Sequence, residues 1–162
     1  MLSGGPGQGN LHFNLSDAAD QALLAIALDT ELGVDLEQIS AGFATEEIAQ
    51  QFFAAAEVRE LAALPAEQRL EGFYLCWTRK EAFIKARGEG LSLPLSDFVV
   101  SLTPGEPAEL RSTWPDAGEA ARWDLRNLEV GPGYAAALCV AGAARPLRME
   151  DWPRTSTIWV NR

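Results

Sequence analysis

The sequence predicts an α+β fold in which an antiparallel sheet carries helices packed on one face. The candidate elements run in the order strand, strand, strand, helix, helix, strand, strand, strand. Short turn-like segments join the first two strands and the last two, which is typical of hairpins and hence of antiparallel pairing. Because the helices are grouped in the middle and do not alternate with strands, we expect them to share one side of the sheet.

The N-terminal part predicts a hairpin. Residues 1–10 contain four glycines and a proline, which indicates a loop. Leu11–Ser16 alternates apolar and polar residues, as a half-buried strand does. Ala22–Leu28 is a continuous apolar run that fits either a strand covered on both faces or a short buried helix. The polar turn Asp17–Asp20 between the two segments favours the hairpin.

Leu32–Glu37 is the third strand and carries two carboxylates on one face. Asp35 and Glu37 are two residues apart, so their Cα atoms lie about 6.6 Å from each other on a strand. Two such carboxylates can converge on one hard cation, with water or a phosphate completing the Mg²⁺ shell. The alternative is a solvated strand face without a ligand.

The central segment is helical. Ser40–Leu64 is the first helical stretch, with Thr45 as its N-cap. Pro65 suits the first turn of a second helix that continues to about Arg87 and ends at Gly88.

The second helix places Trp77, Glu81 and Lys85 four residues apart and therefore along one face. A carboxylate in an aromatic stripe has a desolvation cost that a bound metal or a proton-transfer role would offset. A surface ion pair between Glu81 and Lys85 is the alternative.

The C-terminal part predicts three strands, a loop and a tail. A Gly131–Gly133 turn joins the last two strands, and residues 104–118 contain three prolines, which indicates a loop. From Ala143 the chain is a tail, in which Trp152 and Trp159 suggest packing on another surface. The expected strands are Asp97–Leu102, Trp123–Val130 and Tyr134–Val140.

The composition of the 162 residues is that of one globular domain, with 48% hydrophobic and 22% charged residues. No apolar run is long enough to span a bilayer and no secretory signal is present, so we expect a cytoplasmic protein without membrane contact. Cys76 and Cys139 lack metal-site spacing and fit buried free thiols.

The charge distribution indicates a small anionic ligand. A net charge of −10 argues against general nucleic-acid binding. Within this acidic chain, four cationic residues cluster on the second helix, and phosphates are the ligand that best fits such a patch. They are Arg79, Lys80, Lys85 and Arg87.

Two motifs at this spacing resemble a known family. GVDLE at Gly33–Glu37 and WTRKEAFIKARGEGLSLPL at Trp77–Leu95 are similar to the paired motifs of 4′-phosphopantetheinyl transferases of the surfactin-synthetase-activating (Sfp) type. FNLS at Phe13–Ser16 and the Gly131–Tyr134 turn resemble two further elements of that family. The resemblance implies a 4′-phosphopantetheinyl transferase-like fold and transfer of the phosphopantetheine arm of coenzyme A to a serine of an acyl or peptidyl carrier protein.

The resemblance also implies roles for individual residues. Asp35, Glu37 and Glu81 would hold Mg²⁺ against the diphosphate, and Glu81 would take the serine proton. Lys85 would contact the phosphates and stabilise the leaving group, with Lys80 adding positive charge. Trp77 is expected to be a packing residue. Ser16 and Asp17 fall where the family contacts coenzyme A.

Two departures from the family pattern bear on activity. Asp17 stands where the family has a histidine for the 3′-phosphate, and an aspartate would repel that group. Full-length members have two similar halves, whereas the resemblance here covers only the end of the first half and the second half. We therefore interpret residues 1–32 as the end of a first half, 33–152 as the transferase-like domain and 153–162 as a tail.

These departures keep a second function open, a non-catalytic relative that binds coenzyme A or a carrier protein. A cleft that lacks one half also predicts self-association, as a homodimer first and a trimer second. The sequence does not indicate which carrier protein is served.

Overall fold

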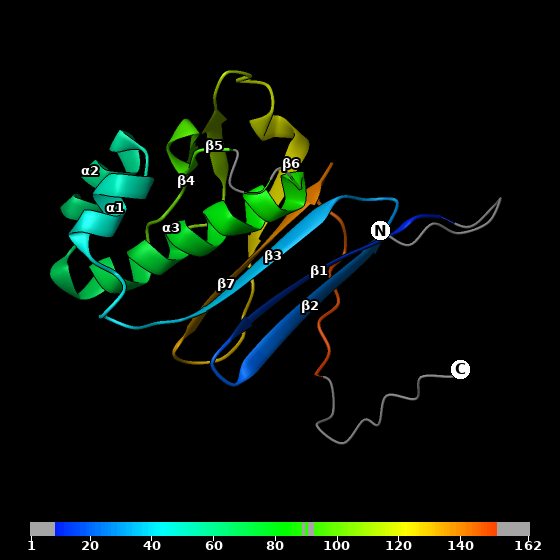
Figure 1. The fold of residues 1–162 in the computed structure, drawn as a ribbon, viewed down its shortest axis with the longest axis horizontal. Helices are drawn as coiled ribbons and strands as arrows, with labels where there is room; N and C mark the ends of the chain where they lie inside the picture. Colours follow the sequence, from blue (N-terminus) through cyan, green and yellow to red (C-terminus); the bar gives the residue numbers. More distant parts are fainter. Residues whose placement is uncertain (1–8, 89, 91–92, 152–162) are drawn as a thin grey trace.

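A computed structural model describes residues 9–88, 90 and 93–151, and it has the predicted α+β architecture (Figure 1). Its centre is a three-stranded antiparallel sheet in the order β3–β7–β6. These strands are β3 (Leu32–Gln38), β7 (Tyr134–Ala141) and β6 (Trp123–Asn127). No helix of the described part of the chain is long and apolar enough to cross a membrane.

The long helix α3 (Ala66–Arg87) covers one face of this sheet (Figure 1). Its apolar side packs on alternate residues of β7, including Ala137 and Cys139. The helix follows Pro65 and ends at Gly88, whose φ of 68° lets its N–H reach the last-turn carbonyls. Both boundaries match the sequence prediction.

Gly33 of β3 sets how closely the helix approaches the sheet. A Cβ atom at this position would lie 2.2 Å from the backbone nitrogen of Ala86 and 2.3 Å from the carbonyl oxygen of Ala82. Only glycine allows this contact between β3 and α3, because both obstacles are helix backbone. The contact holds the carboxylate-bearing face of β3 against α3.

The first predicted helix, Ser40–Leu64, is wrong in its continuity. The chain instead forms two short helices, α1 (Glu46–Phe52) and α2 (Ala55–Ala63). Phe53 between them is extended and buried, with its ring centroid 5.2 Å from that of Phe73. Burial of this ring outweighs the continuous helix. The predicted N-cap is confirmed, since Thr45 Oγ1 accepts a hydrogen bond from the N–H of Ile48 at 3.3 Å.

The predicted N-terminal hairpin is confirmed, and it covers the other face of the central sheet (Figure 1). It consists of β1 (Leu11–Ala18) and β2 (Gln21–Leu28), and the connecting turn is only Ala19–Asp20. The inner side of β2 packs on Val34 and Leu36 of β3. Its outer side is exposed, so within the described part of the chain β2 is covered on one face.

Side chains of the hairpin also satisfy the edge of β3. The side-chain oxygens of Asn14 and Ser16 accept hydrogen bonds from the backbone N–H groups of Val34 (2.9 Å) and Leu36 (3.2 Å). Polar side chains of β1 thereby replace the partner strand that β3 would otherwise need on this edge. The arrangement fixes Ser16 beside the carboxylates of β3.

The C-terminal segments differ from the prediction in detail. Residues 104–118 are not all loop, because β5 (Leu110–Thr113) pairs with β4 (Phe98–Val100). This strand is too short, and its burial too uneven, for its sequence pattern to identify it. The Gly131–Gly133 hairpin is confirmed. Trp152 and Trp159 lie outside the described residues.

Candidate functional site

Three elements bring the predicted residues to one open depression of about 400 Å³. Helix α3 contributes the three residues that are spaced four apart, Trp77, Glu81 and Lys85. Strand β3 contributes its two carboxylates, and β1 closes one end. Neither motif alone contains the site. Its lining is Leu15, Ser16, Asp17, Asp35, Leu36, Glu37, Trp77, Glu81 and Lys85.

A three-membered hydrogen-bond network lies at the centre of the depression. Lys85 Nζ is 2.6 Å from Asp35 Oδ1, and it also donates to Ser16 Oγ at 3.1 Å. Ser16 Oγ in turn donates to Asp35 Oδ1 at 3.2 Å while it accepts from the N–H of Leu36. Lys85 therefore pairs with Asp35, and not with Glu81 as the surface alternative required.

This network uses the whole hydrogen-bonding capacity of the Ser16 hydroxyl. A hydroxyl has one proton to donate and two lone pairs to accept with, and all three are used here. Ser16 is also buried. Its hydroxyl contacts both Asp35 and Lys85, and its predicted contact with coenzyme A stays a prediction. Asp17, the next residue, is exposed at the rim.

The three carboxylates make the site electrostatically unfavourable without a cation. Burial is the largest cause that raises the pKa of Asp35, of Glu37 and of Glu81 above the usual carboxyl range. The charge of Asp35 raises the pKa of Glu37 and of Glu81 further, whereas Lys85 lowers all three. One ammonium group is thus shared by three acids, which leaves negative charge for a ligand to neutralise.

The donor set fits a hard divalent cation. Asp35 Oδ2 is buried and has no hydrogen-bond partner, which is costly unless a ligand satisfies it. Carboxylate oxygens are what Mg²⁺ prefers, and it keeps several waters or phosphate oxygens besides. Among the described residues, no three acidic, histidine or cysteine side chains are already grouped closely enough to hold a metal unaided. The carboxylates of the site therefore fit part of a Mg²⁺ coordination shell, and water or phosphate oxygens would complete it.

Trp77 has a role that the spacing rule did not reveal. Its ring packs against a cluster of phenylalanines, with the centroid of Phe43 at 5.0 Å and that of Phe52 at 5.8 Å. The predicted packing role is therefore confirmed. Its side chain also lines the depression beside Glu37 and lowers the pKa of that carboxyl. Trp77 thus belongs to the site as well as to the aromatic cluster.

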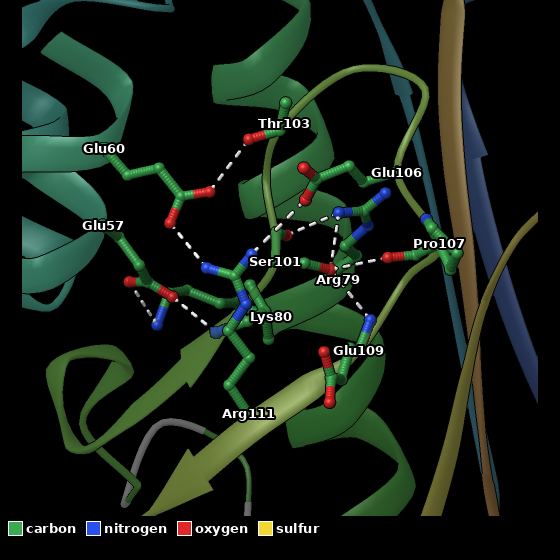
Figure 2. Close-up of polar contacts among 11 residues, drawn as sticks. Glu57, Glu60, Arg79, Lys80, Ser101, Thr103, Glu106, Pro107, Glu109 and Arg111 are labelled. Atoms are coloured by element: carbon green, nitrogen blue, oxygen red, sulfur yellow. Dashed lines mark hydrogen bonds and ion pairs between the residues drawn. The ribbon is translucent and has the colours of Figure 1, made fainter. Parts of the chain in front are cut away.

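Lys80 does not reach the site, and its predicted role at the phosphates is wrong. Its side chain is fully buried on another side of α3, where Nζ lies 2.8 Å from Glu57 Oε2. It also donates to the carbonyl oxygens of Leu95 (2.7 Å) and Phe98 (2.6 Å), and Figure 2 shows it beside Glu57. Because adjacent helical residues differ by about 100° in direction, Lys80 points away from the Glu81 stripe.

The four residues of the predicted cationic patch each have different partners. Arg79 Nη1 donates to both oxygens of Ser101, at 2.5 Å for the carbonyl and 3.0 Å for the hydroxyl (Figure 2). Burial lowers the pKa of Arg79 to about 10. Arg87 pairs with Glu119 at 3.3 Å. Of the four predicted cations, Lys85 alone lines the depression.

Comparison with known proteins agrees with the geometry. A family model described as the 4′-phosphopantetheinyl transferase superfamily matches residues 31–139. The transferase HetI of Nostoc sp. is 36% identical over 135 residues, which cover 83% of this chain and 54% of HetI. Sfp of Bacillus subtilis is 35% identical over 141 residues, covering 86% of this chain and 58% of Sfp. The chain thus spans little more than half the length of these relatives.

Solved structures show the same fold. The holo-[acyl-carrier-protein] synthase of Thermotoga maritima superposes with a TM-score of 0.56 at 23% identity, covering 70% of this chain and 64% of that one. The coenzyme A complex of the Chronobacterium ammoniagenes synthase gives 0.52 at 24% identity, covering 72% and 98%. The chain therefore shares its fold with these synthases over about 70% of its length.

Proposed function

This chain belongs to the 4′-phosphopantetheinyl transferase superfamily, and from that premise we propose that it transfers the 4′-phosphopantetheine arm of coenzyme A to a serine of an acyl or peptidyl carrier protein. One observation carries the proposal. Asp35 of β3 lies up to fifty residues from Glu81 and Lys85 of α3, and all three line a single open depression. Phosphoryl transfer needs neutralisation of charge and fixed positions of the reactants more than it needs covalent chemistry by the protein.

Mg²⁺ is the cofactor we propose, held by Asp35, Glu37 and Glu81. The fit rests on the unpartnered Asp35 Oδ2 and on the raised pKa values of the three acids. When bound, the ion would neutralise the diphosphate of coenzyme A.

Lys85 is proposed to bind the diphosphate of coenzyme A. Its ammonium has three protons, of which Asp35 and Ser16 take two. The third is left for a phosphate oxygen, and the side chain is 28% exposed to the depression. Hydrogen bonds from a charged donor are stronger than neutral ones, so Lys85 would also stabilise the departing phosphate.

Glu81 is proposed as the general base, acting directly or through one water. Burial and Asp35 raise the pKa of Glu81, which makes its carboxylate a better proton acceptor at neutral pH. The serine proton passes to Glu81 while the serine oxygen bonds to the phosphorus that carries the pantetheine arm. The bond from that phosphorus to the bridging oxygen breaks, and adenosine 3′,5′-bisphosphate leaves.

Three further proposals concern the setting of the reaction. We propose that the chain forms a homodimer, with a homotrimer as the second choice. A cytoplasmic location is supported by Cys76 and Cys139, which are both buried and unpaired. A non-catalytic coenzyme A- or carrier-binding module is the second candidate function, favoured by Asp17, whose charge at the rim opposes a phosphate.

The test is mass spectrometry of an apo carrier protein incubated with the chain, coenzyme A and Mg²⁺. We expect a mass gain of one phosphopantetheine, and Glu81→Gln to abolish it. Glu71→Gln, an exposed glutamate on the same helix, is the matched control and should transfer normally. No gain at high enzyme concentration, with a full-length relative active alongside, would reject the transferase in favour of the binding module.

A further inference from the structure

The hydroxyl of Ser16 joins the three elements of the candidate site. Ser16 is buried on β1 between two exposed neighbours, so its side chain points toward β3 and α3. Its Oγ accepts a hydrogen bond from the backbone N–H of Leu36 and donates one to Asp35 Oδ1, each at 3.2 Å. It also accepts from Lys85 Nζ at 3.1 Å. The bond to the β3 backbone fixes the oxygen, and the fixed oxygen contacts both charged groups.

Three carboxylates in the depression compete for the ammonium group of Lys85. They belong to Asp35, Glu37 and Glu81. Glu81 lies four residues before Lys85, which is the spacing of a helical ion pair. Burial raises the pKa of all three carboxyls, and the charge of Lys85 lowers each of them. Because the lysine stem is flexible, attraction alone does not select one acid. Nζ nevertheless lies 2.6 Å from Asp35 Oδ1, the carboxylate oxygen that Ser16 also contacts.

We propose that Ser16 is a positioning residue, which directs Lys85 to Asp35 and away from Glu81. A hydroxyl suits this task because its oxygen accepts from the ammonium while its proton goes to the carboxylate. Both bonds have a charged partner and are therefore stronger than bonds between neutral groups. A bond of this kind changes the populations of two alternatives by roughly ten- to a hundredfold. The single hydroxyl is thus sufficient to select one ion pair out of three.

The selected pair leaves defined groups for the reaction. Ser16 and Lys85 occupy Asp35 Oδ1, so the oxygen left for a cation is the buried Oδ2, which has no hydrogen-bond partner among the described residues. Lys85 keeps one ammonium proton for a phosphate, and Glu81 keeps its carboxylate for the serine proton. Pairing of Lys85 with Glu81 would use the proposed base for an ion pair. This consequence rests on the proposed function, whereas the position of Lys85 does not.

Four variants separate the hydroxyl of Ser16 from its shape and from the stability of the hairpin. Ser16→Thr keeps the hydroxyl, Ser16→Val replaces it by a methyl group in a side chain of the same shape as threonine, and Ser16→Ala removes it without added volume. Asn14→Ala is the matched control. Asn14 Oδ1 accepts from the N–H of Val34 at 2.9 Å, on the same edge of β3, and Asn14 lies outside the lining of the depression. The control therefore removes a β1–β3 bond of the same kind and leaves the Lys85 network in place.

Amine labelling of the free chain measures how firmly Lys85 is held, without coenzyme A, Mg²⁺ or carrier. The sequence has two lysines, and the side chain of Lys80 is fully buried whereas that of Lys85 is 28% exposed. A water-soluble amine reagent followed by peptide mass spectrometry therefore reports on Lys85. Labelling should be about threefold faster or more in Ser16→Ala and Ser16→Val, because Nζ loses one of the partners that it has to leave before it reacts. The rate should stay close to that of the wild type in Ser16→Thr and Asn14→Ala.

Calorimetric titration of coenzyme A in the presence of Mg²⁺, without carrier, shows whether Ser16 acts through Lys85. Ser16→Val should weaken binding roughly tenfold when Lys85 is present and less than about twofold in the Lys85→Met background, because a positioning residue has no effect once its target is gone. A direct contact of Ser16 with coenzyme A, as the resemblance implies, would give the same loss in both backgrounds.

Equal labelling of Ser16→Val and Ser16→Thr would overturn the proposal, and so would a loss of coenzyme A affinity that is as large in the Lys85→Met background as in the wild type. Faster labelling in Asn14→Ala would assign the effect to the packing of the hairpin and overturn it as well. If the labelling rates separate as expected in a chain that does not bind coenzyme A, the position of Lys85 stands and only the proposed function fails.

Discussion

Replacement of Lys80 by methionine tests whether this motif lysine supports the fold or the reaction. The side chains of Lys80 and Glu57 are both fully buried and lie 2.8 Å apart. Nζ uses its three protons on Glu57 and two backbone carbonyls, and it lies 4.2 Å from the ring centroid of Phe98. Glu57 is equally satisfied, because its carboxylate accepts from the N–H groups of Ala54 and Val100. Methionine keeps the apolar stem and removes the charge.

Breaking a buried ion pair by removal of one partner costs about 3–5 kcal/mol, because the other charge stays behind without compensation. In a chain of 162 residues each kcal/mol lowers the melting temperature by about 2–4 °C, so Lys80→Met should melt roughly 6–20 °C below the wild type. The double variant Glu57→Gln/Lys80→Met should recover part of the loss, because it leaves no unpaired charge.

Urea denaturation followed by circular dichroism measures the free energies, and the transfer assay on still-folded protein measures the reaction. We expect Lys80→Met to transfer phosphopantetheine below its melting temperature, whereas Lys85→Met should not. A loss of less than about 1 kcal/mol would refute the structural role of the pair. If Lys80→Met kept normal stability but lost transfer, Lys80 would act at the phosphates as the sequence predicted.

Three further predictions concern the approach of α3 to β3, the charge of Glu81 and the binding of Mg²⁺. Gly33→Ala places a methyl group within 2.3 Å of helix backbone, so it should cost about 3 kcal/mol or more in urea denaturation; a cost below about 0.5 kcal/mol would mean that the contact is looser than described. Without Mg²⁺, Glu81→Gln should raise the free energy of unfolding by less than about 1 kcal/mol and the melting temperature slightly. The reason is that burial raises the pKa of Glu81, so its ionised form is disfavoured in the folded state. Mg²⁺ at a hundredfold excess over its dissociation constant should stabilise the wild type by about 2.7 kcal/mol, and an equal shift in Glu81→Gln would remove Glu81 from the proposed metal site.

The stripe of residues on α3 shows how much of the site could be predicted from the sequence. Four-residue spacing placed Trp77, Glu81 and Lys85 on one face, and two-residue spacing did the same for Asp35 and Glu37; the structure confirms both. Spacing also excludes Lys80 from that stripe, since an adjacent helical residue points elsewhere. The motif resemblance suggested otherwise, and the buried Glu57 pair shows where the side chain lies.

The sequence by itself determined the two hairpins and the long helix with its boundaries, because these depend on periodicity and turn chemistry within short segments. Spacing placed Asp35 and Glu37 on one strand face and Glu81 and Lys85 on one helix face, and the family resemblance added Ser16 and Asp17. Only the tertiary structure decided the partners across segments. It paired Lys85 with Asp35, and it joined Ser16 to the backbone of β3. No local pattern encodes such contacts, because they arise only when β1, β3 and α3 pack together.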